Sequence, residues 1–193
     1  MRCRRCALVF VPAAQFISPE HEKAQYDLHQ NDPGDQGYRR FLSRLFIPLK
    51  EKLEPGAHGL DFGSGPGPTL SLMFEEYGYS MSIYDSFYAD NARVLQQQYE
   101  FITATETVEH LHHPKSELDR LWSLLKPGGH LGIMTKLVSD SDAFANWHYK
   151  NDPTHVSFFS KETFQWLAEM WKAKLEFIGN DVILFEKPGE NAR

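Results

Sequence analysis

The chain has 193 residues, of which 41% are hydrophobic and 13% aromatic, and its formal net charge is -6 at pH 7. This length suits one α/β domain with a substantial core and is short for two independent domains. Nucleic acids and anionic membranes are bound mainly through accumulated Lys and Arg, so the acidic balance argues against both as partners. No apolar run reaches the ~18 residues of a membrane span, and we expect a cytoplasmic protein.

The amino terminus holds the only two cysteines, Cys3 and Cys6, in the pattern C-x-x-C. This spacing is half of a tetrahedral zinc site or a redox pair. The segment resembles the second knuckle of a zinc ribbon whose first knuckle is absent. Two interpretations stay open: a metal site completed by a histidine such as His21, or a free thiol pair. We expect no bound metal. The short apolar run that follows resembles a secretory signal, but Pro12 interrupts it.

Residues 1–38 are interpreted as an amino-terminal extension made of this knob, a short helix and a loop, and residues 39–193 as the main domain. The domain opens with RRFLSRLFIPLKEKL, residues 39–53. Its spacing predicts a helix with a kink at Pro48. The residues on its apolar face are Phe41, Leu42, Leu45, Phe46 and Leu49.

The next segments alternate between strand and helix. GLDF (59–62) ends an apolar strand, PTLSLMFEEY (68–77) reads as a helix with Gly78 as its stop, and SMSIYD (80–85) reads as a second strand. Strand, helix and strand in that order predict a parallel βαβ unit.

The same alternation continues to the carboxyl terminus. YEFITAT (99–105) predicts a buried strand, SELDRLWSLL (116–125) a helix, and HLGIMTK (130–136) a strand entered through the turn KPGG. Residues 160–171 predict a helix capped by Ser160, and residues 174–187 predict two strands around a Gly-Asn turn. We therefore predict an α/β fold, a doubly wound and mostly parallel sheet with a carboxyl-terminal antiparallel hairpin.

The bend GLDFGSGPGPTL, residues 59–70, lies where such a sheet binds its ligand, at the carboxyl end of a strand. Gly63, Gly65 and Gly67 permit positive φ and let a ligand lie against the backbone, and the next helix offers its free N–H groups. A dinucleotide G-x-G-x-x-G fingerprint fails because Pro68 stands at its last glycine, and no G-K-[ST] follows for a P-loop.

The spacing D-x-G-x-G-x-G, with Asp61 as its first residue, resembles motif I of the class I S-adenosylmethionine (SAM)-dependent methyltransferases. Asp85 stands where that family carries an acidic residue for the cofactor's ribose hydroxyls. TATETVEHL (103–111) and LLKPGGHLGI (124–133) resemble the segments after the fourth strand and before the fifth, and residues 146–160 resemble a segment of uncharacterised members. The resemblance implies a Rossmann-like methyltransferase fold and SAM as the cofactor.

One departure from the family concerns its third strand. Only thirteen residues separate Asp85 from Tyr99, too few for a full helix and a strand, so we predict a third strand that is short or missing. Phe87 or Tyr88 is then expected to cover the adenine.

The resemblance implies a set of cofactor-binding residues, and two of them have alternatives. Asp85 is also interpretable as a helix N-cap, and Glu106 either touches the methionine moiety or caps the following turn. The predicted set is Asp61, Gly63, Ser64, Gly65, Gly67, Asp85, Ser86, Phe87, Thr105 and Glu106.

In this fold, amino-terminal helices and the loop after the fifth strand cover the substrate. We predict that His155, or failing it His148, acts as the base or orients the methyl acceptor, with Asp152 fixing its tautomer. The alternative is that both histidines pin a loop. The predicted substrate contacts are Tyr26, His29, Tyr38, Glu109, His110 and Tyr149. His112 and His113 are not expected to bind metal, because adjacent side chains on a turn diverge.

The segments expected to cover the substrate are rich in aromatic residues and histidines. This composition favours a small, partly apolar acceptor such as a phenol or quinol. Since no D-P-P-Y or N-P-P-Y follows the fourth strand, methylation of adenine or glutamine nitrogen is disfavoured, and we predict transfer to oxygen or carbon. The alternative is a non-catalytic SAM-binding sensor or a module that docks on a partner. An NAD-linked oxidoreductase is disfavoured by Pro68.

Overall fold

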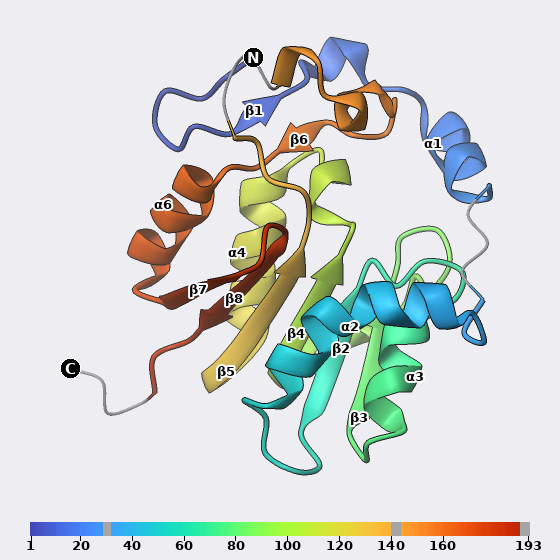
Figure 1. Cartoon of the computed structure of the whole chain (residues 1–193), viewed down its shortest axis with the longest axis vertical. Coiled ribbons are helices and arrows are strands. Elements are labelled where there is room, and N and C mark those ends of the chain that lie inside the picture. Colours follow the sequence, from blue (N-terminus) through green and yellow to red (C-terminus); the bar gives the residue numbers. More distant parts are fainter. Residues whose placement is uncertain (29–31, 140–143, 190–193) are drawn as a thin grey trace.

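The computed structural model describes residues 1–28, 32–139 and 144–189. At its centre is a six-stranded sheet in the order β3-β2-β4-β5-β8-β7 (Figure 1). The parallel strands are β2 (His58–Phe62), β3 (Ser80–Tyr84), β4 (Tyr99–Thr105) and β5 (Leu125–Met134). The antiparallel strands are β7 (Lys174–Ile178) and β8 (Val182–Glu186), with β8 next to β5. The predicted doubly wound sheet with its carboxyl-terminal hairpin is confirmed.

The third strand of the family pattern is missing, as the short spacing predicts. Residues 86–98 form a single 3-10 helix, η2 (Ala92–Gln96), and no strand. As a result β3 is the edge strand on this side of the sheet, while β2 pairs with β3 on one side and with β4 on the other.

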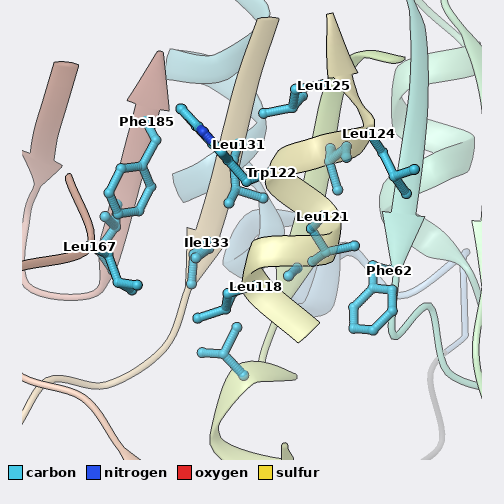
Figure 2. Close-up of a cluster of buried hydrophobic side chains, with 14 of the residues drawn as sticks. Phe62, Leu118, Leu121, Trp122, Leu124, Leu125, Leu131, Ile133, Leu167 and Phe185 are labelled. Carbon is cyan, nitrogen blue, oxygen red and sulfur yellow. The ribbon is translucent and has the colours of Figure 1, made fainter. Parts of the chain in front are cut away.

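Helices cover both faces of the sheet. On one face, α2 (Gln36–Lys50) and α3 (Thr69–Glu75) pack with sheet residues such as Phe101. On the other, α4 (Pro114–Leu124) and α6 (Lys161–Trp171) form the larger core cluster. Figure 2 shows part of that cluster around α4. Four residues of the predicted face of α2 are buried: Leu42, Leu45, Phe46 and Leu49.

The amino-terminal segment folds onto the end of the sheet toward which β4 and β5 point (Figure 1). Strand β1 (Val9–Phe10) pairs antiparallel with β6 (Ser157–Phe158), and Val11 N donates to Val156 O at 2.9 Å. Strand β6 contacts η3 (Val108–His110). The other short elements of the amino-terminal segment and of the segment before β6 are η1 (Ala13–Gln15), α1 (Pro19–Tyr26) and η4 (His148–Asn151). The extension therefore holds residues 156–158 in place.

Two boundaries differ from the sequence prediction. The KPGG segment lies inside β5, because Leu125 already pairs with Tyr99 before the strand continues. Helix α2 begins at Gln36, with Asp35 as its N-cap, and so crosses residue 38, the expected border of the extension. Within the described residues, no helix combines the length and the apolar character needed to cross a membrane.

Candidate functional site

A cavity of about 670 Å³ opens at the carboxyl ends of β2, β3 and β4. This is the topological switch point of the sheet, where a doubly wound fold binds its ligand, and the volume suits a small molecule. Helices α1 and α2 contribute Tyr26 and Tyr38 to its wall, and the 152–155 segment contributes Asp152 and His155. Residues from separate parts of the chain thus meet at one site.

The glycine bend after β2 forms the floor of the cavity. Gly63 and Gly65 have φ of +74° and +64°, values that side chains other than glycine rarely adopt. Gly63 N donates to Tyr84 O at 2.8 Å, which ties the bend to the end of β3. A Cβ at Gly63 would lie 2.3 Å from Thr107 Cγ2, so this position requires glycine. Gly67 does not line the cavity.

Asp85 links the glycine bend to the turn that follows β3. Its Oδ2 accepts from Gly65 N at 2.9 Å, and its Oδ1 accepts from Phe87 N at 2.8 Å and from Tyr88 N at 3.1 Å. The carboxylate therefore holds a turn and also lines the cavity together with Ser86 and Phe87. It is not the N-cap of the next helix, because Asn91 takes that position in η2.

A pair of carboxyl groups lies after β4. Glu106 follows the last residue of the strand with φ of +48°, and burial, together with the charge of Glu109, raises its pKa to about 8. Glu109 is fully buried and accepts hydrogen bonds from Tyr149 Oη and from Thr135 Oγ1, the latter at 3.0 Å. Burial raises the pKa of Glu109 as well. Tyr149 does not line the cavity, but it contacts two residues that do, Glu109 through its hydroxyl and His155 through its ring and its carbonyl oxygen.

His155 and His110 lie ring edge to ring face, with centroids 4.7 Å apart. His155 Nδ1 lies 2.6 Å from Tyr149 O, and His110 Nδ1 lies 3.2 Å from Thr154 O. A carbonyl oxygen only accepts, so both Nδ1 atoms carry a hydrogen. Burial and then the neighbouring His110 lower the pKa of His155, which favours its neutral ring. That ring carries its lone pair on Nε2, 3.8 Å from Asp152 Oδ2.

The other histidines predicted for the site are placed differently. His148 is exposed and does not line the cavity, whereas His155 is buried and does. His29 lies outside the described residues. Asp152 is held by Thr154, whose N and Oγ1 donate to its Oδ1 at 2.9 and 2.6 Å.

Most of this chain matches a family described as "Methyltransferase domain", over residues 29–173. The chain belongs to this methyltransferase family. Curated relatives include the ubiquinone biosynthesis O-methyltransferases of Vibrio atlanticus (34% identical over 77 residues) and Marinobacter nauticus (33% over 84). The matches cover 40% and 42% of this chain and 32% and 35% of those proteins. The chain thus spans about a third of the length of the curated relatives it matches.

Solved structures show the same fold. The 1,6-didemethyltoxoflavin-N1-methyltransferase of Burkholderia thailandensis, with bound S-adenosylhomocysteine, matches with a TM-score of 0.62 and 15% identity over 96% of this chain and 97% of that one. An O-methyltransferase family protein of Burkholderia thailandensis matches with a TM-score of 0.55 and 12% identity over 88% and 63% of the two chains. The Rossmann-like methyltransferase fold and SAM as the cofactor agree with the expectations from the sequence.

The cavity of the methyltransferase domain has unsatisfied polar groups that fit such a cofactor. Ser64 Oγ and Thr105 Oγ1 are buried, line the cavity, and have no hydrogen-bond partner among the described residues. A buried hydroxyl without a partner costs ~1–3 kcal/mol. A bound ligand whose polar groups form hydrogen bonds with Ser64 and Thr105 would remove that cost. SAM carries such groups, so these two residues suit it.

Several cavity residues of the methyltransferase domain carry no signal in the sequence. Glu22 on α1 accepts from Tyr26 Oη at 2.7 Å, and Glu117 and Arg120 reach the cavity from α4. They come from helix surfaces, where charged residues are ordinary, so no motif marks them. Only helical spacing pairs these side chains: Glu22 and Tyr26 are four residues apart on α1, and Glu117 and Arg120 are three residues apart on α4.

Asp61, the first residue of the glycine motif, does not face the cavity but links the elements that form its wall. The side chain is buried, does not line the cavity, and accepts from Thr103 Oγ1 at 2.7 Å and from Ser71 Oγ at 3.1 Å. It therefore ties β2 to β4 and to α3 at the switch point.

Asp61 should make the SAM-free domain less stable as pH rises. Burial raises its pKa from 3.8 to about 6, so its stabilising contribution is complete below pH 3.8 and is lost as pH rises through 6. Asp61→Asn lacks this proton equilibrium. We therefore expect the difference in melting temperature, Asp61→Asn minus parent, to increase as pH rises from 3.8 to 6. The exposed Asp90→Asn is the control, and a difference that stays flat or falls across this range would contradict the prediction.

Asp85 should contribute to SAM affinity if it receives the ribose hydroxyls. Its loss removes a charge-assisted hydrogen bond worth ~1.5–3 kcal/mol, so Asp85→Ala should bind SAM roughly tenfold to a hundredfold more weakly. Calorimetric titration of SAM measures this. Asp85→Asn keeps an oxygen for the Phe87 and Tyr88 amides and loses the charge together with the hydrogen bond from Gly65 N. Asp90→Ala is the exposed control. Unchanged affinity in folded Asp85→Ala would refute the ribose assignment.

Proposed function

We propose that this methyltransferase domain transfers a methyl group from SAM to an oxygen or carbon of a small, partly apolar acceptor. The single observation that carries the proposal is that one cavity joins the glycine bend to a wall of aromatic and imidazole side chains. The ubiquinone biosynthesis O-methyltransferases among the relatives support an oxygen acceptor.

The cofactor would lie on the glycine bend. The Ser64 and Thr105 hydroxyls and the Asp85 carboxylate are available to it, and Phe87 and Glu106 line the same cavity. SAM supplies, when bound, a methyl group made electrophilic by its positively charged sulfur. Binding and alignment are then the main tasks of the protein.

The acceptor would lie between α1, α2 and the 152–155 segment. Tyr26 packs edge-on against His110, with ring centroids 5.2 Å apart, and lies 5.6 Å from Phe87. Tyr38 stacks with Phe41 at 6.2 Å, and both line the cavity. These rings offer apolar surfaces to an aromatic acceptor, and the carboxylates beside them offer hydrogen-bond acceptors for its hydroxyl groups.

His155 is the best-placed group to orient a hydroxyl and take its proton. Tyr149 O holds the Nδ1 hydrogen, so the neutral ring has its lone pair on Nε2. Asp152 lies on that side and would stabilise the ring once it is protonated. His148 lacks such a placement, because it is exposed and outside the cavity.

Methyl transfer to a panel of phenols, catechols and primary amines tests the proposal, with S-adenosylhomocysteine formation as the measurement. We expect turnover with a hydroxylated aromatic acceptor. His155→Asn keeps a donor for Tyr149 O but lacks Nε2, and it should lower turnover by ~100-fold to 10,000-fold while SAM affinity is retained. The exposed His148→Ala is the matched control and should turn over at nearly the parental rate.

Two results would count against this proposal. Parental turnover in His155→Asn would remove the histidine from the chemistry. SAM binding with no turnover on any acceptor class would favour the alternative of a non-catalytic SAM-binding module.

A further inference from the structure

Three side chains at the acceptor end of the cavity form a cluster of metal-ligating type. Glu109, His110 and His155 each place one ligand atom within 4.8 Å of the others. All three line the cavity. Two imidazoles and one carboxylate are the ligand set of several catalytic zinc sites, which keep a further coordination position open.

The backbone fixes both rings in the tautomer that a metal needs. Thr154 O accepts from His110 Nδ1 and Tyr149 O accepts from His155 Nδ1, so in the neutral rings the lone pairs are on the Nε2 atoms. Metal-binding histidines usually donate their other ring N–H to a carbonyl or carboxylate in this way. The segment that carries His155 is itself fixed, because Val156 N donates to Glu109 O at 2.9 Å.

The charge around the cluster favours a cation. Glu109 is buried at 1% exposure, and the groups that donate hydrogen bonds to it are the neutral hydroxyls of Tyr149 and Thr135. Buried carboxylates are normally paired with a charge or bound to a metal. The carboxylates lining the cavity are Glu22, Asp85, Glu106, Glu109, Glu117 and Asp152, and Arg120 is the one Lys or Arg among the described residues that line it.

We propose that Glu109, His110 and His155 bind one divalent transition-metal ion of the zinc type beside the cavity. The ion would leave a coordination position toward the space where the acceptor is expected, and would bind the acceptor's oxygen there. The binding of the acceptor's oxygen to the ion rests on the proposed function. In the metal-bound protein the ion, and not the His155 lone pair, would hold the acceptor's hydroxyl. The binding site itself does not depend on methyl transfer.

Zn²⁺ titration followed by calorimetry tests the site, in the absence of SAM and acceptor. The Cys3→Ser/Cys6→Ser double variant is the parent for this experiment, because the C-x-x-C pair is a competing zinc ligand. We expect one equivalent of Zn²⁺ to bind and to raise the melting temperature. Glu109→Gln and His155→Asn should each weaken binding at least tenfold, whereas the exposed His113→Ala should bind as the parent does.

Absence of Zn²⁺ binding in the parent, or equal binding in the parent and both variants, would overturn the inference. If Glu109→Gln fails to fold, His110→Gln replaces it, and a loss of binding is again the expected result. Because the titration contains neither SAM nor acceptor, a negative result leaves the proposed methyl transfer standing. Conversely, a protein that binds Zn²⁺ through these residues but shows no turnover on any acceptor class, with or without Zn²⁺, would refute the proposed function alone.

Discussion

The parallel pairing of β2 with β3 on one side and β4 on the other is the constraint on which the site depends. It brings the carboxyl ends of three strands together, so that the glycine bend, the Asp85 turn and Glu106 face one space. Asp61 reinforces the pairing by accepting hydrogen bonds from Thr103 on β4 and Ser71 on α3. A buried carboxylate is costly, and here it fixes the geometry of the bend next to it.

Two aspartates covered by the family resemblance, Asp61 in the glycine motif and Asp85 after the next strand, have different physical roles. Asp61 is shielded from the cavity, and its two partners are side-chain hydroxyls. Asp85 lines the cavity and holds three backbone amides. The resemblance implies that both residues lie near the cofactor. The structure distinguishes them, because the Asp85 side chain lines the cavity and the Asp61 side chain does not. That orientation follows from the pleat of β2 and from the turn after β3, which the sequence pattern does not resolve.

Local periodicity predicted the regular elements because their cause is local. The apolar stripe of α2 and the run that forms β4 carry their own signal, and the thirteen residues after Asp85 were enough to predict the missing strand. The pairing of β1 with β6 had no such signal, since two-residue strands have no periodicity. The choice between His148 and His155 also depended on packing: one is exposed, and the other is anchored through Tyr149 O.

The balance of charge in the cavity links the fold to its expected ligands. Six carboxylates face one guanidinium, that of Arg120, among the described lining residues. Burial raises the pKa of Glu106 and of Glu109, and the charge of Glu109 raises that of Glu106 further, so the protonated forms are favoured when no cation is present. A positively charged ligand supplies the missing opposite charge and becomes more strongly bound because the site is partly desolvated. The carboxylates at the glycine bend and those near the two histidines are separate groups, so a sulfonium at one end and a metal ion at the other would each find its own partners in the same cavity.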